Sequence, residues 1–290
     1  MIGRPKYPLL RKRMLLSRMQ TTTTCSPNLR VAQLLTAMIV PLALVASAGG
    51  LFINSLYRDP ASVLPAIKGQ DLVTLLALPA LVVALVAAQR GATRATMVWI
   101  GLLSYVCYAY TGAAFAYAFN AFFLMYVALF SLSVGALMAI ASGIDVIELQ
   151  QRFDHTAPRR AVGIALIVLA LMLAISELGQ IIPSLATGTV PELIMRSGGA
   201  GNFVYVLDLG IVVPLALLAA IWLWRCLPWG DVLAGCLLIE ASTIGLALLS
   251  ATWFSVNAGL PLEIGLTVVY SVIAFGGLAM TVWFFRHCRG

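Results

Sequence analysis

Three carboxylic acids lie inside long apolar stretches of the chain, where they could hold a proton or a cation: Glu177, Asp208 and Glu240. A charged carboxylate at the centre of a bilayer costs at least ~2.5–3.5 kcal/mol, so such residues usually face a bundle interior or a water-filled cavity. The functional interpretation is a proton, cation or solute site. The structural alternative is a protonated or hydrogen-bonded packing contact. Both stay open, and function is favoured less for Glu240 than for the other two.

Two tyrosines could serve as partners for these acids. Tyr105 and Tyr108 are three residues apart, so they share one face of a helix, and their hydroxyls need hydrogen-bond partners when buried. No Lys or Arg lies at a similar depth to neutralise the acids, which must therefore be protonated, hydrogen-bonded or hydrated. We expect a hydrated pocket in the outer half of the protein, formed by Asp71, Glu177, Asp208, Tyr105 and Tyr108.

A capping role is the simpler interpretation for some other acids. Asp71, Asp231 and Glu263 each lie at an expected helix start, where a carboxylate accepts free backbone N–H groups and suits the helix dipole. We expect capping for Asp231 and Glu263, and leave both roles open for Asp71.

Several kinds of chemistry lack the residues that they need. The only histidines are His155 and His287, and both lie outside the apolar segments, which argues against haem or a His-ligated metal site. The five cysteines include no C-x-x-C pair. No nucleotide-binding or hydrolase motif occurs in a usable context. We therefore expect no metal, no cofactor and no catalytic residue set, and an enzyme is the least favoured class.

The elements that position these residues are apolar helices. The chain is 61% hydrophobic and 10% charged, whereas soluble domains are about 45–50% apolar and about 25% charged. A helix needs about 20 apolar residues to cross a bilayer. The sequence predicts an all-α polytopic transmembrane bundle, one domain over 26–290, after a basic arm at 1–25. Its eight helices are expected at 31–54, 70–89, 96–117, 121–148, 161–182, 204–225, 231–255 and 262–285.

The distribution of basic residues predicts the orientation. With the N-terminus inside, the inner segments hold fifteen Lys and Arg and the outer segments hold three, Arg58, Lys68 and Arg196. Because positive charge is retained on the cytoplasmic side, both termini are predicted to be cytoplasmic in the inner (plasma) membrane. The net charge of +7 is then a topology signal, and we expect no nucleic-acid partner. The first helix also resembles a secretory signal peptide, although we favour a retained helix.

A weak internal repeat relates the two halves, 31–148 and 161–285. Asp71 precedes Pro79, and Asp208 precedes Pro214; each proline lies eleven residues before an arginine at the inner helix end. Two parallel four-helix repeats of this kind occur in transporters. The alternative is coincidence, because acids at helix starts and prolines inside membrane helices are both ordinary.

Several motifs resemble those of a known family. They are Gly69-Gln70-Asp71-Leu72-Val73-Thr74-Leu75, the Tyr- and Phe-rich hairpin over 105–130, Val206-Leu207-Asp208-Leu209-Gly210, and Leu223-Trp224-Arg225. Together they are similar to an uncharacterised family of bacterial multi-pass membrane proteins, over about residues 50 to 285. The resemblance implies architecture and no chemistry, since that family has no established activity.

Three functions remain in competition. The first is a transporter or a solute- or cation-binding protein, with a polar cavity in the outer half. The second is a non-catalytic subunit or scaffold that packs against a membrane-protein partner or a second copy. The third is a membrane-embedded enzyme acting on a lipid-like substrate. The lipid bilayer is a partner in all three, and we favour the first because of the buried acids and the prolines that could break helices.

Overall fold

The structure is a computed structural model that describes residues 26–199 and 202–289, so the basic arm at 1–25 lies outside the described part. The prediction of an all-α bundle is confirmed, because eight helices are long and apolar enough to cross a membrane. These spans are α2 (Pro27–Phe52), α3 (Leu64–Gln89), α4 (Thr93–Phe115), α5 (Phe123–Gly143), α7 (Arg159–Thr187), α9–η1–α10 (Phe203–Trp224), α11 (Pro228–Asn257) and α12–η2–α13 (Ile264–Arg286). The last span consists of α12 (Ile264–Ser271), the π-helical turn η2 (Val272–Gly276) and α13 (Gly277–Arg286).

The fourth span ends earlier than the sequence predicted. A helix was expected to run to residue 148, but α5 stops at Gly143 and a separate short helix, α6 (Val146–Gln151), follows. Asp145 causes the break, because its carboxylate caps α6 by accepting from the N–H groups of Ile147 and Glu148 at 3.1 and 2.9 Å.

The fifth span continues beyond its expected end. It was predicted to stop before Pro183, yet α7 runs to Thr187 and ends where Gly188 takes a left-handed conformation, with φ 68°. A proline removes only one backbone donor, and a left-handed glycine is the stronger stop signal. No helix was predicted between 182 and 204, but this stretch contains the short helix α8 (Glu192–Ser197).

The sixth span is not a regular α-helix. It consists of α9 (Phe203–Leu207), a π-helical turn η1 (Asp208–Val212) and α10 (Val213–Trp224). The N–H of Val213 donates to the carbonyl of Asp208, five residues earlier. Pro214 follows at once, and its ring lacks a donor and crowds the preceding turn. We attribute the widened turn to this proline, and such turns often occur at functional sites.

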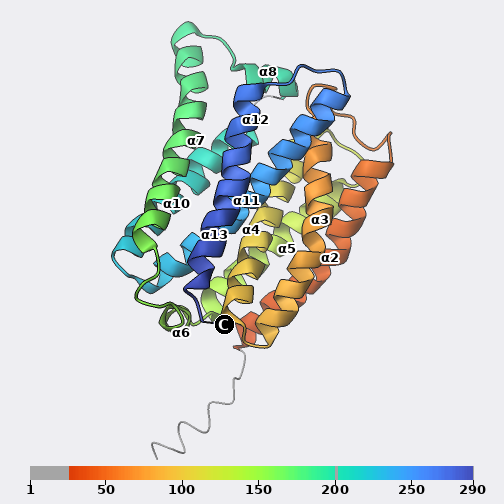
Figure 1. The fold of residues 1–290 in the computed structure, drawn as a ribbon. Coiled ribbons are helices and arrows are strands. Elements are labelled where there is room, and N and C mark those ends of the chain that lie inside the picture. The colour runs from red at the N-terminus through yellow and green to blue at the C-terminus, as the bar shows by residue number, and fades with distance from the viewer. Residues whose placement is uncertain (1–25, 200–201, 290) are drawn as a thin grey trace, which may run out of the picture.

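α11 is the central helix of the bundle and packs against α3, α4, α10 and α13 (Figure 1). Small residues allow the close crossings, as is usual between membrane helices. A side chain at Gly69 would meet the backbone of Ala251, and one at Gly245 would meet the backbone of Ala274. α2 packs against α3 and α5, so the first four spans form a closed group.

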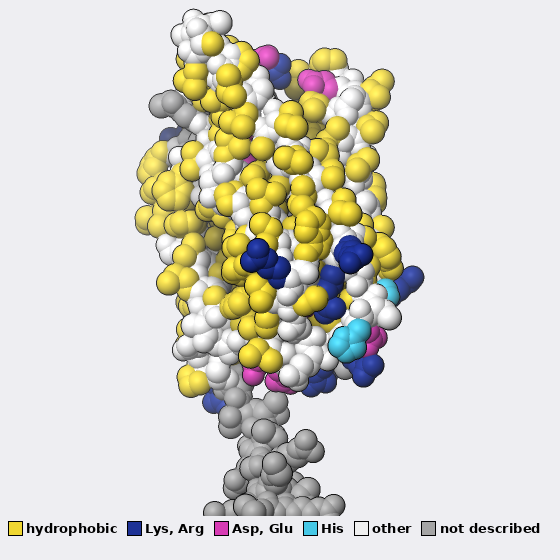
Figure 2. Space-filling view, turned by 90° about the vertical axis from the view of Figure 1, so that its left-hand side faces the viewer, with side chains coloured by type: hydrophobic (Ala, Val, Ile, Leu, Met, Phe, Trp, Pro, Cys, Tyr) yellow, Lys and Arg dark blue, Asp and Glu magenta, His cyan; other side chains and the backbone are white. Residues whose placement is uncertain are grey.

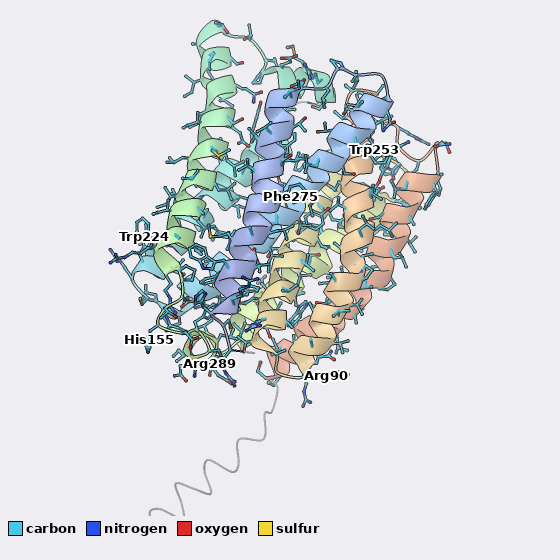
Figure 3. All side chains as sticks on the ribbon, in the orientation of Figure 1. Arg90, His155, Trp224, Trp253, Phe275 and Arg289 are labelled. Carbon is cyan, nitrogen blue, oxygen red and sulfur yellow. The ribbon has the colours of Figure 1, made fainter. Side chains whose placement is uncertain are left out.

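The two ends of the bundle differ in charge. α6 and the C-terminus lie at one end and α8 at the other (Figure 1). On the face in Figure 2, most Lys and Arg side chains lie in the half that contains the C-terminal end. Arg90 and Arg289 both lie at that end (Figure 3), which we call the basic end.

Candidate functional site

Asp71 is not a helix cap. α3 begins at Leu64, so Asp71 lies about two turns inside the helix and its side chain is buried. The carboxylate instead accepts a hydrogen bond of 2.5 Å from the hydroxyl of Tyr57, which lies in the loop between α2 and α3. Gly50 on α2 makes room for this pair, because a side chain there would overlap both groups.

Tyrosines surround this carboxyl group in a layer that we call the Asp71 cluster: Tyr57, Gln70, Asp71, Tyr105 and Tyr117. Tyr57 and Tyr117 pack edge to face, with ring centroids 5.8 Å apart. The amide of Gln70 donates to the Tyr117 hydroxyl at 3.1 Å, and the Tyr105 hydroxyl donates to the Gln70 carbonyl at 3.3 Å. The cluster therefore joins α3, α4 and both neighbouring loops through hydrogen bonds.

The loop tyrosines of the Asp71 cluster, Tyr57 and Tyr117, keep their hydroxyl protons. Burial, followed by the nearby Asp71 carboxyl, raises the pKa of Tyr57 far above its ordinary value. The same two causes raise the pKa of Tyr117. The hydroxyl of Tyr57 therefore stays protonated at any physiological pH, and its hydrogen bond to Asp71 is available throughout that range.

A second group of polar side chains, which we call the Asp208 cluster, consists of Tyr108, Glu177 and Asp208. Tyr108 on α4 donates to Asp208 Oδ1 at 3.0 Å. The carboxyl groups of Glu177 on α7 and Asp208 on η1 lie close enough to interact with each other. Because ionised carboxylates only accept hydrogen bonds, a hydrogen bond between the two acids would require that one of them carries a proton.

Glu177 retains unused hydrogen-bonding capacity. Its side chain is only 5% exposed, and its Oε2 atom is buried without a hydrogen-bond partner. An unsatisfied buried oxygen is costly, more so when it is charged. Glu240 on α11 adds a third carboxyl group close enough to interact electrostatically with Asp208 and Tyr108. The geometry thus leaves an acceptor that a proton, a cation or a water molecule could satisfy.

In the described residues, no basic side chain forms an ion pair with Asp71, Glu177, Asp208 or Glu240. Four ion pairs occur in the described residues, and they join Arg152 with Glu148, Arg159 with Asp231, Arg196 with Glu192, and Arg289 with Asp154. None includes Asp71, Glu177, Asp208 or Glu240. The negative charge of these four must be removed by protonation or balanced by a group from outside this part of the chain.

The five residues predicted for one pocket therefore fall into two groups. Tyr105 belongs with Asp71, whereas Tyr108 belongs with Glu177 and Asp208. Two cavities of about 460 and 550 Å³ lie beside α12 and between α3 and α11, and none of the five lines either of them. The single hydrated pocket stays a prediction.

The capping interpretation is wrong for Asp231 as well. Asp231 lies inside the first turn of α11 and is buried, and it pairs with Arg159 at 2.8 Å. Gln150 adds a hydrogen bond of 3.3 Å. Glu263 lies at the N-cap of α12, but its side chain makes no capping hydrogen bond. Neither acid takes part in the two clusters.

Sequence reasoning missed two features of this region. It did not place Phe203, whose ring lies 6.4 Å from that of Tyr108 and would overlap any side chain at position 112. It also ranked Glu240 below the other acids. The position of Glu240, nine residues into its predicted helix and far from any cap, was the available signal.

The described residues contain no group of three or more His, Cys, Asp or Glu side chains arranged to hold a metal ion. The fold and the two clusters define a multi-pass helical membrane protein with paired acids inside its spans. No family model, curated protein or solved structure matches the chain.

Proposed function

We propose that this protein transports or binds a small cation or protonatable solute, and that Glu177 and Asp208 form its ion-handling pair. The observation that carries the proposal is the buried contact between these two carboxyl groups, without a basic partner and with one oxygen unsatisfied. Such a pair exchanges a proton for a cation without leaving a net charge of −2 in the bilayer.

The surroundings of the pair support movement of an ion. Asp208 lies on the widened turn η1, and Glu177 lies on α7, most of whose residues from Ser176 onward are exposed. Helices interrupted near paired charges are typical of transporter binding sites. We also propose that the basic end faces the cytoplasm, because positively charged loops are retained there. The two clusters would then lie in the half of the membrane away from the cytoplasm.

The test uses purified full-length protein reconstituted into liposomes that contain a pH-sensitive dye. A gradient of Na⁺ or of K⁺ is imposed, and the internal pH is followed. We expect cation-driven proton movement in the wild type and its loss in Glu177→Gln and Asp208→Asn. Thermal unfolding in NaCl, KCl and choline chloride at equal ionic strength reports binding in the absence of transport.

The matched control is Glu192→Gln. It removes a carboxylate at the same end of the bundle, but one that is exposed and paired with Arg196 at 2.5 Å. This variant should behave as the wild type. A folded wild-type protein that shows neither cation-dependent stabilisation nor proton movement would contradict the proposal, as would variants at Glu177 and Asp208 that respond like the wild type.

A further inference from the structure

Two exposed arginines lie beside an exposed tryptophan where α10 ends against the start of α7. We call this group, which consists of Arg160, Trp224 and Arg225, the Trp224 patch. The indole N–H of Trp224 donates to the Arg160 carbonyl at 3.4 Å, and the ring lies over Gly163, where any side chain would overlap it. Arg225 follows Trp224 in the chain, so both arginines lie next to one fixed ring. All three side chains of the patch are exposed, so a ligand can reach them.

No acid in the described residues neutralises these two arginines. Neither takes part in any of the four ion pairs. Asp231, the acid that lies against the start of α7, is already paired with Arg159 at 2.8 Å. The first turn of α7 contains no acid, and a positive charge there opposes the helix dipole. Both guanidinium groups are therefore available to an anion from outside the chain.

The position of the patch places it at the membrane interface. In Figure 3, Trp224 lies further from the tip of the basic end than His155 and Arg289. Figure 2, which views this side of the bundle, shows Lys and Arg side chains set among hydrophobic ones. An exposed tryptophan at the end of a span is typical of the headgroup layer. The arginines of the patch thus lie at the depth of lipid headgroups.

An apolar stripe on α7 leads away from Arg160 into the membrane. Ile164, Val168 and Leu171 are all exposed. They lie four, eight and eleven residues beyond Arg160, which places them on the same face of the helix. From Arg160 to Leu171 the stripe is ~16 Å long, about half of a ~30 Å hydrocarbon core. The surface therefore joins a basic group at the interface to an apolar track as deep as one leaflet.

The combination of charge and depth identifies the partner. Guanidinium groups bind phosphate oxygens through paired, charge-assisted hydrogen bonds. At the interface, the phosphate at hand is that of a phospholipid, and basic groups between helix ends favour anionic headgroups. We propose that the Trp224 patch binds the phosphodiester of an anionic phospholipid, whose acyl chain lies along the stripe from Ile164 to Leu171.

The test measures which lipid lies beside Trp224. Full-length protein is reconstituted into vesicles of phosphatidylcholine and phosphatidylglycerol, in which one or the other lipid carries brominated acyl chains that quench nearby tryptophans. The Trp224 signal is the difference between each protein and the same protein with Trp224→Phe. We expect phosphatidylglycerol to be preferred over phosphatidylcholine at least ~fivefold beside Trp224. Inorganic phosphate, added at constant ionic strength, should leave this preference unchanged.

Two variants and one control isolate the contribution of the patch. Arg160→Gln and Arg225→Gln should each lower the preference for phosphatidylglycerol about fivefold, the factor that one basic residue contributes at an anionic surface. Arg90→Gln removes the same charge from the basic end, but from the opposite side of the bundle in Figure 3. It should leave the preference at Trp224 unchanged.

Three outcomes would overturn the proposal. The first is equal quenching of Trp224 by the two brominated lipids in the wild-type protein. The second is an effect of Arg90→Gln as large as those of Arg160→Gln and Arg225→Gln, which would mean a general attraction of the basic end to anionic membranes. The third is loss of the preference on addition of inorganic phosphate, which would assign the arginines to a soluble anion.

Discussion

Asp71 and Asp208 are both buried acids that accept a hydrogen bond from a tyrosine, yet their surroundings differ. Asp71 faces the closed group of four spans, and its partner Tyr57 is a fixed donor in a packed layer of aromatic rings. Asp208 faces a second carboxyl group, Glu177, on a helix whose outer part is largely exposed. Asp71 therefore has tyrosine side chains around it, whereas Asp208 has both a tyrosine hydroxyl and a second carboxyl group beside it.

The difference separates a structural role from an ion-handling role. A carboxyl group whose partner is a tyrosine hydroxyl contributes to packing, and any change there costs stability. Two carboxyl groups that lie close together repel each other when both are ionised, so their interaction depends on the availability of protons or cations. We infer that variants in the Asp71 cluster change stability first, whereas variants in the Asp208 cluster change the response to ions.

The largest expected effect is on cation response in the Asp208 cluster. Asp208→Asn should weaken the apparent cation affinity at least ~tenfold, because interactions with a charged group contribute ~1.5–3 kcal/mol. The measurement is the concentration of Na⁺ or K⁺ that gives half-maximal stabilisation in thermal unfolding. Asp71→Asn should lower the unfolding temperature but retain the wild-type midpoint for the cation. Equal loss of cation response in both variants would contradict the assignment of different roles to Asp71 and Asp208.

A steric change in the Asp71 cluster should have the next largest effect. Gly50→Val places methyl groups where Asp71 and Tyr57 now lie, and we expect a loss of ~1–3 kcal/mol in stability from overpacking. Gly179→Val is the control, because nothing lies within 4 Å of the added carbon. The readout is the midpoint of denaturant or thermal unfolding. Similar midpoints for the two variants would argue against a tightly packed cluster.

Removing one hydroxyl should have a smaller effect. Tyr57→Phe leaves Asp71 Oδ2 without its donor, so we expect a loss of ~1 kcal/mol, the net contribution of one hydrogen bond. Tyr205→Phe is the matched control, since its hydroxyl donates to the exposed Gln180 at 3.1 Å. Unfolding of the two variants is compared at neutral pH. If Tyr205→Phe were less stable than Tyr57→Phe, the hydrogen bond from Tyr57 to Asp71 would not be the more important one for stability.

The smallest perturbation is a single cysteine substitution, which tests on which side of the membrane the two clusters lie. Cys226 is exposed near the basic end, whereas Cys288 is buried and burial raises the pKa of its thiol to about 11. In cells, an impermeant maleimide should react with Ser62→Cys and miss Cys226, and it should reach Cys226 only after permeabilisation. Cys288 should stay unmodified. Labelling of Cys226 in intact cells would invert the orientation.

The spans were predictable because each is a long apolar segment, and their existence depends on composition more than on tertiary contacts. Their ends were less predictable. Asp145 starts a new helix where continuity was expected, and Pro183 fails to stop one. Both outcomes depend on which backbone N–H and C=O groups form hydrogen bonds near the helix end. The spacing of apolar residues does not predict these hydrogen bonds.

The acids of the site were identified from sequence, but their grouping was not. Glu177, Asp208 and Tyr108 lie on three different spans, and only the helix packing brings them together. Asp71 was considered a possible helix cap because its helix was started six residues late, at 70 in place of Leu64. The loop donor Tyr57 was not considered as its partner, since nothing in the spacing joins a loop residue to a carboxylate fourteen residues away.

The widened turn η1 has a consequence for the tolerance of this span to insertion and deletion. A π-helical turn holds one more residue than an α-helical turn spanning the same step, so it accommodates that residue without changing the rotational phase between α9 and α10. Deleting one residue from 209–212 would restore a regular helix and retain this phase, whereas deleting one residue from α10 would rotate everything before it by ~100°. Only the deletion in α10 would point the carboxyl group of Asp208 away from α7, even though both deletions would hardly change the composition of the span.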